Sequence, residues 1–539
     1  MENRRPNIVF IIADDLTPAY HRCYGGPTPT PNIDRIAREG ALFQQAHAVA
    51  PLCNPSRYAI FTGQVPGRAP SASRDCSTAE PYSIAQNANL EPATPSLAKI
   101  LREGGYFTGH VGKWHSNFAY AGKEEWAEEL GPEADLDDPK IDQILREKHA
   151  AHVKTVKECG GFDWAGAVTW GNLMKNRPKP LQFHNPGWTT DTALEFLDVA
   201  AEAGRPFYLH LANTLPHGPD PHKSFGADHR YTFAGKLDEP PKSLPPDASV
   251  IERMRKAGIQ TSGPIAGINA GVIQVDDQVG AVRAKLESLG LLENTIMVYT
   301  GDHGIHGKGT CYLGGYHMPM CVRWPNQIPA GQVVSAPHSH VDFLPTLCEA
   351  AEVAVPDDHR IDGVSQLRLW KGTGPGARDF TYQEMGVGRA ITKGRWRYIT
   401  FFYPESIITQ MENGELELPP SFEAYRDGPF GDYNIKNKPC YFEPEQLYDL
   451  ERDPCERRNL AYDPGCEHVL EKMRTLLHGV TDTLPGPYRK DVPPFMRSYA
   501  YRRLTEKRLL AVKQRSVHPE GFDQEKIFNL NLPDPLARE

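Results

Sequence analysis

Short apolar runs that read as strands alternate along this chain with helical patterns. Such alternation is typical of an α/β fold in which helices cover a central sheet. A short helix is predicted over 33–39, opened by Pro31-Asn32. The predicted strands are 7–13, 106–111, 207–212 and 295–300.

The clearest predicted helix carries one apolar stripe. Between Ile268 and Leu289, apolar residues recur at steps of four and three, which is the period of an amphipathic helix. Gly290 then provides a C-cap. The strand over 295–300 follows directly.

Acidic residues follow two of the predicted strands. Asp14-Asp15 come directly after 7–13, and Asp302-His303 come after 295–300 and one glycine. Open α/β sheets bind ligands at the carboxyl ends of their strands. We therefore expect these two acidic strand ends, from distant parts of the chain, to meet at one site.

Changes in residue pattern along the chain predict a large domain over 1–380, a small α+β domain over 381–485 and a tail over 486–539. In the small domain, 389–400 and 446–450 read as strands and 466–480 reads as a helix. The tail is basic and proline-punctuated, which suits an oligomerisation arm or a wrapping tail. Three irregular stretches are interpreted as insertions that decorate the site: 64–91, 116–179 and 215–263.

Charge and composition narrow the function. The 539 residues include 59 Lys and Arg against 68 Asp and Glu, a net charge of −9, so we expect no binding of nucleic acid. An acidic protein that binds an anion must gather its cations locally. The ten cysteines lack regular spacing and no CxxC pair occurs, which argues against a disulfide scaffold or a zinc ribbon.

The apolar run near the start of the sequence is not predicted to be a membrane segment or a signal peptide. The apolar run from Ile8 to Ala13 is too short to cross a bilayer, and Asp14-Asp15 follow it where a signal peptide has small residues. We expect a cytoplasmic protein without a membrane segment, or a periplasmic or secreted one if an export signal has been removed.

Several short polar motifs are ambiguous when each is taken alone. A strand that ends in Asp-Asp is often only a solvated turn, and a buried cysteine is commonly inert. The motifs also include Asp302-His303-Gly304, Gly112-Lys113-Trp114-His115, Pro216-His217, Gly307-Lys308-Gly309 and Cys53-Asn54-Pro55-Ser56-Arg57 followed by Thr62-Gly63.

Together these motifs resemble a known family. The pattern C-x-P-S-R-x4-T-G from Cys53 to Gly63 is similar to the signature of type I sulfatases, in the alkaline phosphatase superfamily. The motifs also stand in that family's order, and the connecting text Thr30-Pro31-Asn32-Ile33-Asp34 and the closing segment Leu447-Tyr448-Asp449-Leu450 look similar. The resemblance covers roughly 5 to 480. It implies an alkaline phosphatase-like fold with a large mixed, mostly parallel sheet.

The resemblance also implies two cofactors. Cys53 would be oxidised by a formylglycine-generating enzyme to formylglycine, whose hydrate supplies the nucleophile. Asp14, Asp15 and Asp302 supply hard carboxylate oxygens, which suit Ca²⁺ or Mg²⁺. His303 would complete this metal site, at a position where many relatives carry asparagine.

By the same resemblance, Lys113 and Lys308 hold the sulfate oxygens, and Arg57 steadies the hydrated aldehyde and the metal. His217 or Lys308 protonates the departing alcohol, after attack that Asp302 assists. His115 then removes the proton whose loss expels sulfate.

The chain departs from the family pattern after Lys308. Relatives often continue as Tyr-Glu-Gly-Gly and then Arg-Val-Pro, whereas this chain reads Tyr312-Leu313-Gly314-Gly315 and then His317-Met318-Pro319. We expect the loss of that acid and that arginine to change a structural ion pair or one wall of the pocket.

Substrate identity rests on weaker patterns. Five of the eight tryptophans lie between 114 and 188, where they either stack on a sugar or, the commoner outcome, belong to the core. The segment 446–461 resembles that of glycan sulfatases. We expect hydrolysis of a carbohydrate sulfate ester. The alternatives are an aryl or alkyl sulfatase, a phosphonate monoester or phosphodiester hydrolase, and a sulfated-glycan binding protein without turnover. An oligomer could form through the tail.

Overall fold

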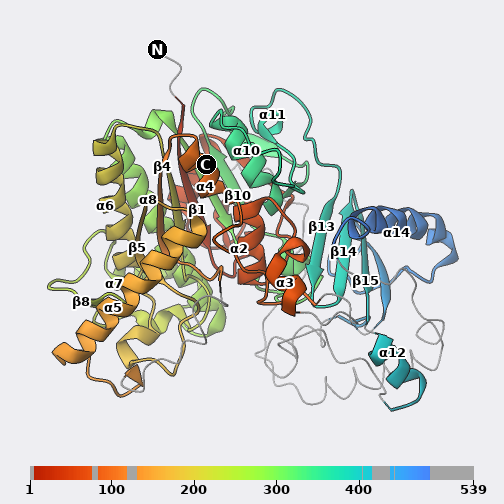
Figure 1. The fold of residues 1–539 in the computed structure, drawn as a ribbon, viewed down its shortest axis with the longest axis horizontal. Helices are drawn as coiled ribbons and strands as arrows, with labels where there is room; N and C mark the ends of the chain where they lie inside the picture. Colours follow the sequence, from red (N-terminus) through yellow and green to blue (C-terminus); the bar gives the residue numbers. More distant parts are fainter. Residues whose placement is uncertain are drawn as a thin grey trace.

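An eight-stranded sheet forms the centre of the protein (Figure 1). The computed structural model describes residues 5–75, 83–117, 130–403, 405–415, 438–441 and 443–485. The tail predicted over 486–539 and the side chain of Trp126 lie outside these residues.

The strand order is β11-β2-β10-β9-β1-β6-β4-β5. Strand β10 runs antiparallel to both of its neighbours, and all other pairs in this sheet are parallel. The sheet is thus mixed and mostly parallel, which confirms the predicted fold class. The strands are β1 (Asn7–Ala13), β2 (Ala41–Phe43), β4 (Phe107–Lys113), β5 (Trp164–Thr169), β6 (Phe207–Ala212), β9 (Thr295–Gly301), β10 (Met320–Arg323) and β11 (Gln332–Val334).

Strand β1 sends alternate side chains to two separate cores, as the period of two in a strand requires. Its even-numbered apolar residues, such as Phe10, pack in a cluster with the helices α2 (Cys53–Thr62), α4 (Leu97–Glu103) and α10 (Phe343–Ala350). Its odd-numbered residues, such as Val9, pack with α1 (Pro31–Arg38), α6 (Pro186–Ala203) and α8 (Pro264–Ser288). Figure 1 shows α6 and α8 on one side of the sheet and α2 and α10 on the other.

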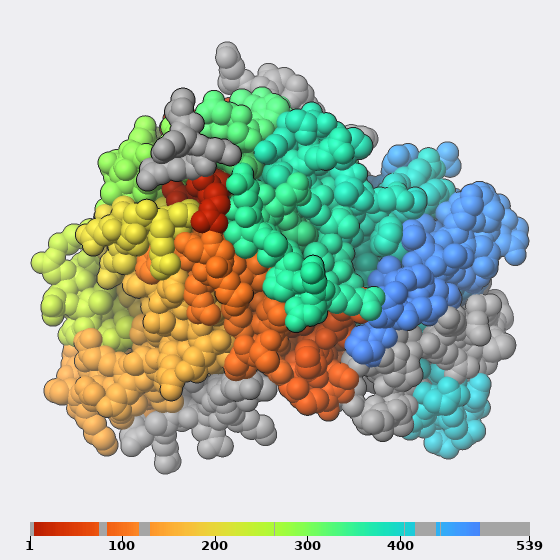
Figure 2. All heavy atoms as spheres, turned by 45° about the horizontal axis from the view of Figure 1, so that its top comes forward, coloured from red at the N-terminus to blue at the C-terminus, as the bar shows by residue number. Residues whose placement is uncertain are grey.

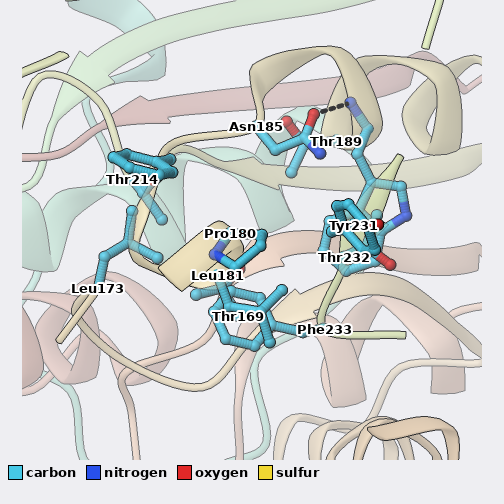
Figure 3. Close-up of a pocket in the computed structure, with 12 residues that line it drawn as sticks. Thr169, Leu173, Pro180, Leu181, Asn185, Thr189, Thr214, Tyr231, Thr232 and Phe233 are labelled. Atoms are coloured by element: carbon cyan, nitrogen blue, oxygen red, sulfur yellow. Dashed lines mark hydrogen bonds between the residues drawn. The ribbon is translucent and has the colours of Figure 1, made fainter. Parts of the chain in front are cut away.

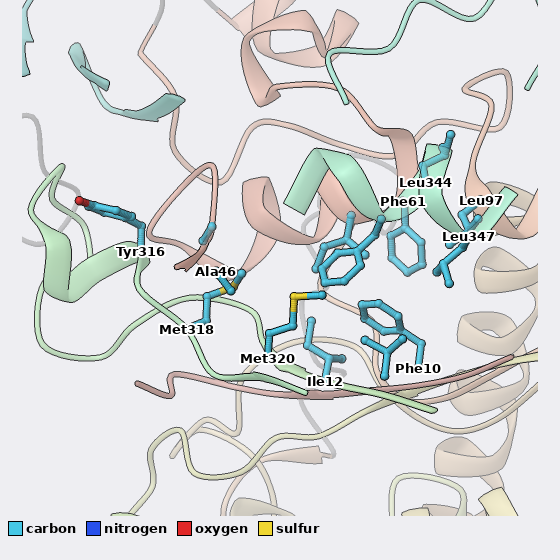
Figure 4. Close-up of a cluster of buried hydrophobic side chains, with 14 of the residues drawn as sticks. Phe10, Ile12, Ala46, Phe61, Leu97, Tyr316, Met318, Met320, Leu344 and Leu347 are labelled. Carbon is cyan, nitrogen blue, oxygen red and sulfur yellow. The ribbon is translucent and has the colours of Figure 1, made fainter. Parts of the chain in front are cut away.

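The core beneath α2 is visible in Figure 4, where side chains from the sheet meet side chains from the helices. Phe10, Ile12 and Met320 point from the strands toward Phe61 of α2 and Leu344 of α10. All five side chains are fully buried. This packing fixes α2 over the middle of the sheet, and with it the residue at which α2 begins.

A second, antiparallel sheet follows in the chain, in the order β13-β14-β15-β16. It confirms the predicted α+β character of this part: the strands are β13 (Thr381–Met385), β14 (Gly388–Lys393), β15 (Trp396–Phe401) and β16 (Glu445–Asp449), and α14 (Glu467–Thr481) packs on them. Figure 2 shows the blue end of this part against the orange residues of the first hundred, where Arg68 Nη1 donates to the carbonyl of Thr483 at 2.8 Å. The domain boundary at 380 stays a prediction.

The irregular reading of 116–179 was wrong. That stretch contains α5 (Pro139–Thr155) and β5, which forms one edge of the large sheet. The surface of α5 is mostly charged and β5 is only six residues long, so neither gave a clear apolar period. Similarly, 215–263 holds α7 (Asp247–Lys256) and a hairpin of β7 (Tyr231–Thr232) and β8 (Gly235–Lys236).

Among the described residues, no helix combines the length and the apolar character needed to cross a membrane.

The remaining elements are short. The short elements are β3 (Ala46–His47), α3 (Pro70–Asp75), α9 (Leu313–Tyr316), β12 (His338–Ser339), α11 (Leu367–Trp370) and α12 (Glu405–Glu412).

Candidate active site

The two acidic strand ends meet as predicted. Strands β1 and β9 are parallel neighbours, and Ala13 pairs with Gly301 at their carboxyl ends. Asp15 N–H donates to Asp302 Oδ1 at 3.0 Å, so the residues after the two strands are bonded to each other.

Helix α2 brings two more of the predicted residues to this edge. Cys53 is its first residue, and Arg57 lies one turn later on the same face. Arg57 Nη1 donates to the carbonyl of Lys113, at the end of β4, at 3.2 Å. Gly63, with φ of 66°, ends the helix in the left-handed conformation that favours glycine.

Cys53 lies at the centre of the group. Its Sγ atom is 3.3 Å from Asp14 Oδ1, 3.3 Å from His303 Nε2 and 3.6 Å from Lys113 Nζ. Burial, together with the charge of Asp14, raises the pKa of the Cys53 thiol well above its usual range. The unmodified side chain is therefore held as a neutral thiol, which is a poor nucleophile.

Each of the three buried carboxylates has a cationic partner. Lys113 binds Asp14, Lys308 binds Asp15 and Arg57 binds Asp302. Burial alone would raise the pKa of Asp14, but Lys113, His217 and Arg57 hold it well below its usual range. Unlike Asp14, Asp302 has its pKa raised, by burial and by the charge of Asp14. Three cations thus balance three carboxylates without any ion from outside.

His303 faces the same group with one defined ring nitrogen. Its Nδ1 lies 3.1 Å from the carbonyl of Gly304, and a carbonyl only accepts, so Nδ1 carries the proton. Nε2 lies 3.0 Å from Asp15 Oδ1. This contact is favourable when Nε2 carries a proton or when a metal ion lies between the two atoms.

The donor set therefore fits a cation. Ligand atoms of Asp14, Asp15, Cys53 and His303 all lie within 4.8 Å of one another, and His303 has the backbone hydrogen bond that orients metal-binding histidines. Asp302 borders this group: its Oδ1 accepts from the backbone N–H groups of Asp15 and His303, and its Oδ2 accepts from Arg57. This buried group could bind a divalent metal.

His115 and His217 lie at different depths. His115 is buried, with φ of 45°, and its backbone N–H donates to the carbonyl of Trp170 at 2.9 Å. Burial, assisted by Lys113, lowers its pKa well below the usual range. The His217 side chain keeps 16% exposure, against 4% or less for Asp15 and Lys308, and its Nε2 is 3.5 Å from Asp15 Oδ2. The site therefore opens toward solvent beside His217.

Sequence reasoning missed three residues that support this site. Asn172 Oδ1 accepts from Lys113 Nζ at 2.6 Å. His184 lies 2.8 Å from Thr214 Oγ1 and 2.9 Å from the carbonyl of Pro219, on the two sides of His217. Asn172 and His184 follow β5, which was not predicted, so no signal pointed to them. His340 Nδ1 lies 3.0 Å from Ser56 Oγ, which donates to the carbonyl of Asp302.

A cavity beside the site is lined by aromatic and hydroxyl side chains (Figure 3). It lies next to Thr169, the ladder partner of Lys113. Its ≈ 20 Å³ of water-accessible space holds about one water molecule, so it is not a pocket for a sugar. Trp188 lines this cavity, and Trp114 and Trp170 are buried too. These tryptophans serve packing rather than stacking on a ligand.

Comparison with known proteins agrees with this geometry. Residues 6–353 match the family model described as Sulfatase. Steryl-sulfatase from Rattus norvegicus is 31% identical over 519 residues, which cover 86% of this chain and 86% of that protein. N-acetylgalactosamine-6-O-sulfatase from Bacteroides thetaiotaomicron is 26% identical over 547 residues, which cover 89% and 93%.

A solved structure supports the fold. It comes from a study of how Bacteroides thetaiotaomicron metabolises multiple glycosaminoglycans, and it matches with a TM-score of 0.60 at 21% identity, covering 89% of this chain and all of that one. The family match spans more than half of the chain, and the motif residues converge on one buried site. The chain belongs to the sulfatase family and is a sulfuric ester hydrolase.

Proposed function

We propose that this protein hydrolyses sulfate esters of carbohydrates, with Cys53 in its formylglycine form as the nucleophile. The observation that carries the proposal is the position of Cys53 Sγ, within 3.6 Å of Asp14, His303 and Lys113. Formylglycine supplies a hydroxyl nucleophile, whereas the thiol is held neutral by its surroundings. The carbohydrate class is supported by the N-acetylgalactosamine-6-O-sulfatase similarity.

Asp14, Asp15, Asp302 and His303 would hold the metal, with Ca²⁺ as the first candidate and Mg²⁺ as the alternative, because hard oxygen ligands dominate the set. When bound, the metal neutralises sulfate charge and lowers the pKa of a hydroxyl beside it.

Lys113 and Lys308 would bind the sulfate oxygens. Each now pairs with a carboxylate of the proposed metal set. A divalent cation on Asp14 and Asp15 would compensate these carboxylates and free both ammonium groups for an anion. The amino end of α2 adds partial positive charge, since no side chain caps its free N–H groups.

Proton transfer would occur on two sides of the sulfate group. At the opening, where the sugar must remain outside the buried site, His217 or Lys308 would protonate the leaving oxygen. Burial lowers the pKa of His217 to about 4, whereas Asp15 raises the pKa of Lys308, so Lys308 is the group that carries a proton at neutral pH. His115 is buried on the inner side and its lowered pKa keeps the ring neutral. A neutral ring can accept the proton whose removal releases sulfate and regenerates the nucleophile.

Two measurements test this function together. We expect the peptide containing Cys53, from protein made with a formylglycine-generating enzyme, to weigh about 18 Da less than the thiol form. The same protein should hydrolyse sulfated monosaccharides, and Cys53→Ala should abolish this, whereas Cys466→Ala, a half-buried cysteine before α14, should not. If protein with Cys53 converted to formylglycine cleaves no sulfate ester, the proposal is refuted.

The choice among esters needs a panel of substrates. The steryl-sulfatase similarity favours an alkyl sulfate as the second candidate. Sulfated hexosamines, an aryl sulfate, a steryl sulfate, a phosphonate monoester and a phosphodiester should be compared by kcat/KM. A preference for the hexosamine ester supports the proposal. Binding of a sulfated glycan without any turnover, in converted protein, would identify a binding protein instead.

Two further expectations belong to this proposal. Conversion of Cys53 requires a separate modifying enzyme, so expression without it should leave a thiol and no activity. Light scattering of the full chain and of 1–485 would reveal an oligomer formed through the tail. Cellular location stays a prediction.

A further inference from the structure

The segment between β9 and β10 joins the active site to the C-terminal sheet. It carries His303 and Lys308 near its start and then folds back, so that Gly304 N–H donates to the carbonyl of Gly315 at 2.9 Å. Gly309 N–H donates at 3.0 Å to the carbonyl of Pro51, two residues before Cys53. Any shift of this segment would therefore move Lys308 relative to Cys53.

Two charged residues of the C-terminal part hold the backbone of the segment, one from strand β15 and one from the loop that follows β16. Arg397 of β15 donates from Nε at 3.1 Å, and also from Nη2, to the carbonyl of Cys311. The carboxylate of Glu456 accepts the N–H of Leu313, at 3.1 and 3.0 Å to its two oxygens. Arg397 Nε lies 3.2 Å from Glu456 Oε1. The two residues thus form one clamp around consecutive turns of the segment.

This clamp is completely removed from solvent. The side chains of Arg397 and Glu456 are 0% exposed, and the guanidinium of Arg397 lies 3.8 Å from the ring centre of Tyr316. Lys438 Nζ makes a further contact with Glu456 at 2.9 Å. Buried ion pairs contribute little to net stability, and their best-attested use is to specify one arrangement. The arrangement specified here is that of 311–316.

We propose that Arg397 and Glu456 are positioning residues for Lys308, which they act on through the backbone of 309–313. At position 313, where relatives often carry glutamate, the backbone N–H donates to Glu456, 143 residues away in the chain. The positioning follows from the geometry alone. Its kinetic consequence rests on the proposed function, in which Lys308 binds a sulfate oxygen.

Hydrogen exchange on the full chain tests the positioning without any activity. Arg397→Lys keeps the charge that Glu456 needs but loses the fork that holds Cys311, and Glu456→Gln is the second variant. The informative amides are Gly309 and Thr310, which bond to Pro51 and Gly307 rather than to the clamp. We expect both amides to exchange about tenfold faster in each variant, because loss of the clamp lowers the free energy of local opening of the segment.

A matched control separates this effect from general destabilisation. Glu445→Gln removes another buried acid of the C-terminal part, which lies in β16 and pairs with Arg474 and Tyr398. It should leave the exchange of Gly309 and Thr310 unchanged. If Arg397→Lys and Glu456→Gln also leave those two amides unchanged, the positioning role is overturned.

A double-mutant cycle then tests the route through Lys308. The dissociation constant of inorganic sulfate, measured by calorimetry on converted, metal-loaded protein, should rise about tenfold in Arg397→Lys, as coupled neighbours typically show. In a Lys308→Ala background the same substitution should change it by less than about twofold. If Arg397→Lys weakens sulfate binding by the same factor in the wild-type and the Lys308→Ala backgrounds, Arg397 does not act through Lys308. If the wild type neither binds sulfate nor hydrolyses an ester, the proposed function fails, and hydrogen exchange still decides the positioning.

Discussion

Lys308 Nζ lies 2.8 and 2.6 Å from the two carboxylate oxygens of Asp15, although 293 residues separate them in the chain. The two residues follow neighbouring parallel strands, so their meeting is a consequence of the register of β1 and β9. Asp15 raises the pKa of Lys308 despite burial, which acts in the opposite direction. The ammonium therefore stays charged while it is paired with Asp15.

Removal of the metal should stop turnover without unfolding the protein. The buried carboxylates keep their pairing with Lys113, Lys308 and Arg57, so no uncompensated charge cluster remains. After treatment with a chelator, we expect lost activity, an unchanged circular dichroism spectrum and a lower Tm, because ligand binding to the folded state stabilises it. Added Ca²⁺ and Mg²⁺ can then be compared for recovery.

Asp14→Asn should lower the metal content measured by elemental analysis. Asp379→Asn is a suitable control, since Asp379 forms an exposed pair with Lys393. Equal metal content in both variants would contradict the proposed site.

His115→Ala should separate cleavage of the ester from release of sulfate. Without the buried base, we expect one equivalent of alcohol to be released rapidly and steady turnover to fall by about 10²–10⁴-fold, the usual contribution of a general base. Rapid-quench measurement of alcohol and sulfate in parallel provides the readout. Alcohol and sulfate formed in equal amounts at all times would assign His115 another role.

Asn172→Ala should weaken substrate binding by releasing Lys113. The amide oxygen accepts a charge-assisted hydrogen bond at 2.6 Å, and such bonds contribute about 1.5–3 kcal/mol. We expect KM to rise by about tenfold or more by this arithmetic. Met174→Ala, at a neighbouring residue that is 51% exposed, should leave KM unchanged. Similar KM values for the two variants would show that Asn172 does not support substrate binding through Lys113.

His338→Phe should reduce the loss of stability in acid. Burial, with a contribution from Arg378, lowers the pKa of His338 from 6.5 to about 4, against the opposing charge of Asp342. Below pH 6.5 the unfolded chain gains a proton that the folded state cannot bind until about pH 4. Stability is therefore lost as pH falls through this window, by about 3 kcal/mol in total from this residue.

The ring of His338 is enclosed by Phe43, Phe343 and Trp370, so phenylalanine suits the position. Between pH 7.5 and pH 5 we expect the Tm of the wild type to fall further than that of His338→Phe. His468→Gln, at an exposed position of α14, should behave as the wild type does. Parallel curves for all three proteins would show that His338 does not govern this loss.

Much of the fold could be predicted, because the periodicity of apolar residues in a strand or helix is a local property of the sequence. The strands at 7–13 and 207–212 have the bounds that their apolar runs indicate, and the stripe on α8 is buried against the sheet. Strand β5 could not be predicted, because it is short and its neighbour α5 is mostly solvated. The loop that carries Asn172 was missed for the same reason.

The sequence by itself determined which chemistry the site can hold: a cysteine at the start of a helix, acids at two strand ends, and the lysines and histidines of recognisable motifs. Only the tertiary structure decided how these groups pair with one another. Asp14 pairs with Lys113, His217 marks the opening, and Glu456 reaches Leu313. Strand periodicity is set by neighbouring residues, whereas the strength of an ion pair depends on distance and on exclusion of water, which arise when remote segments pack together.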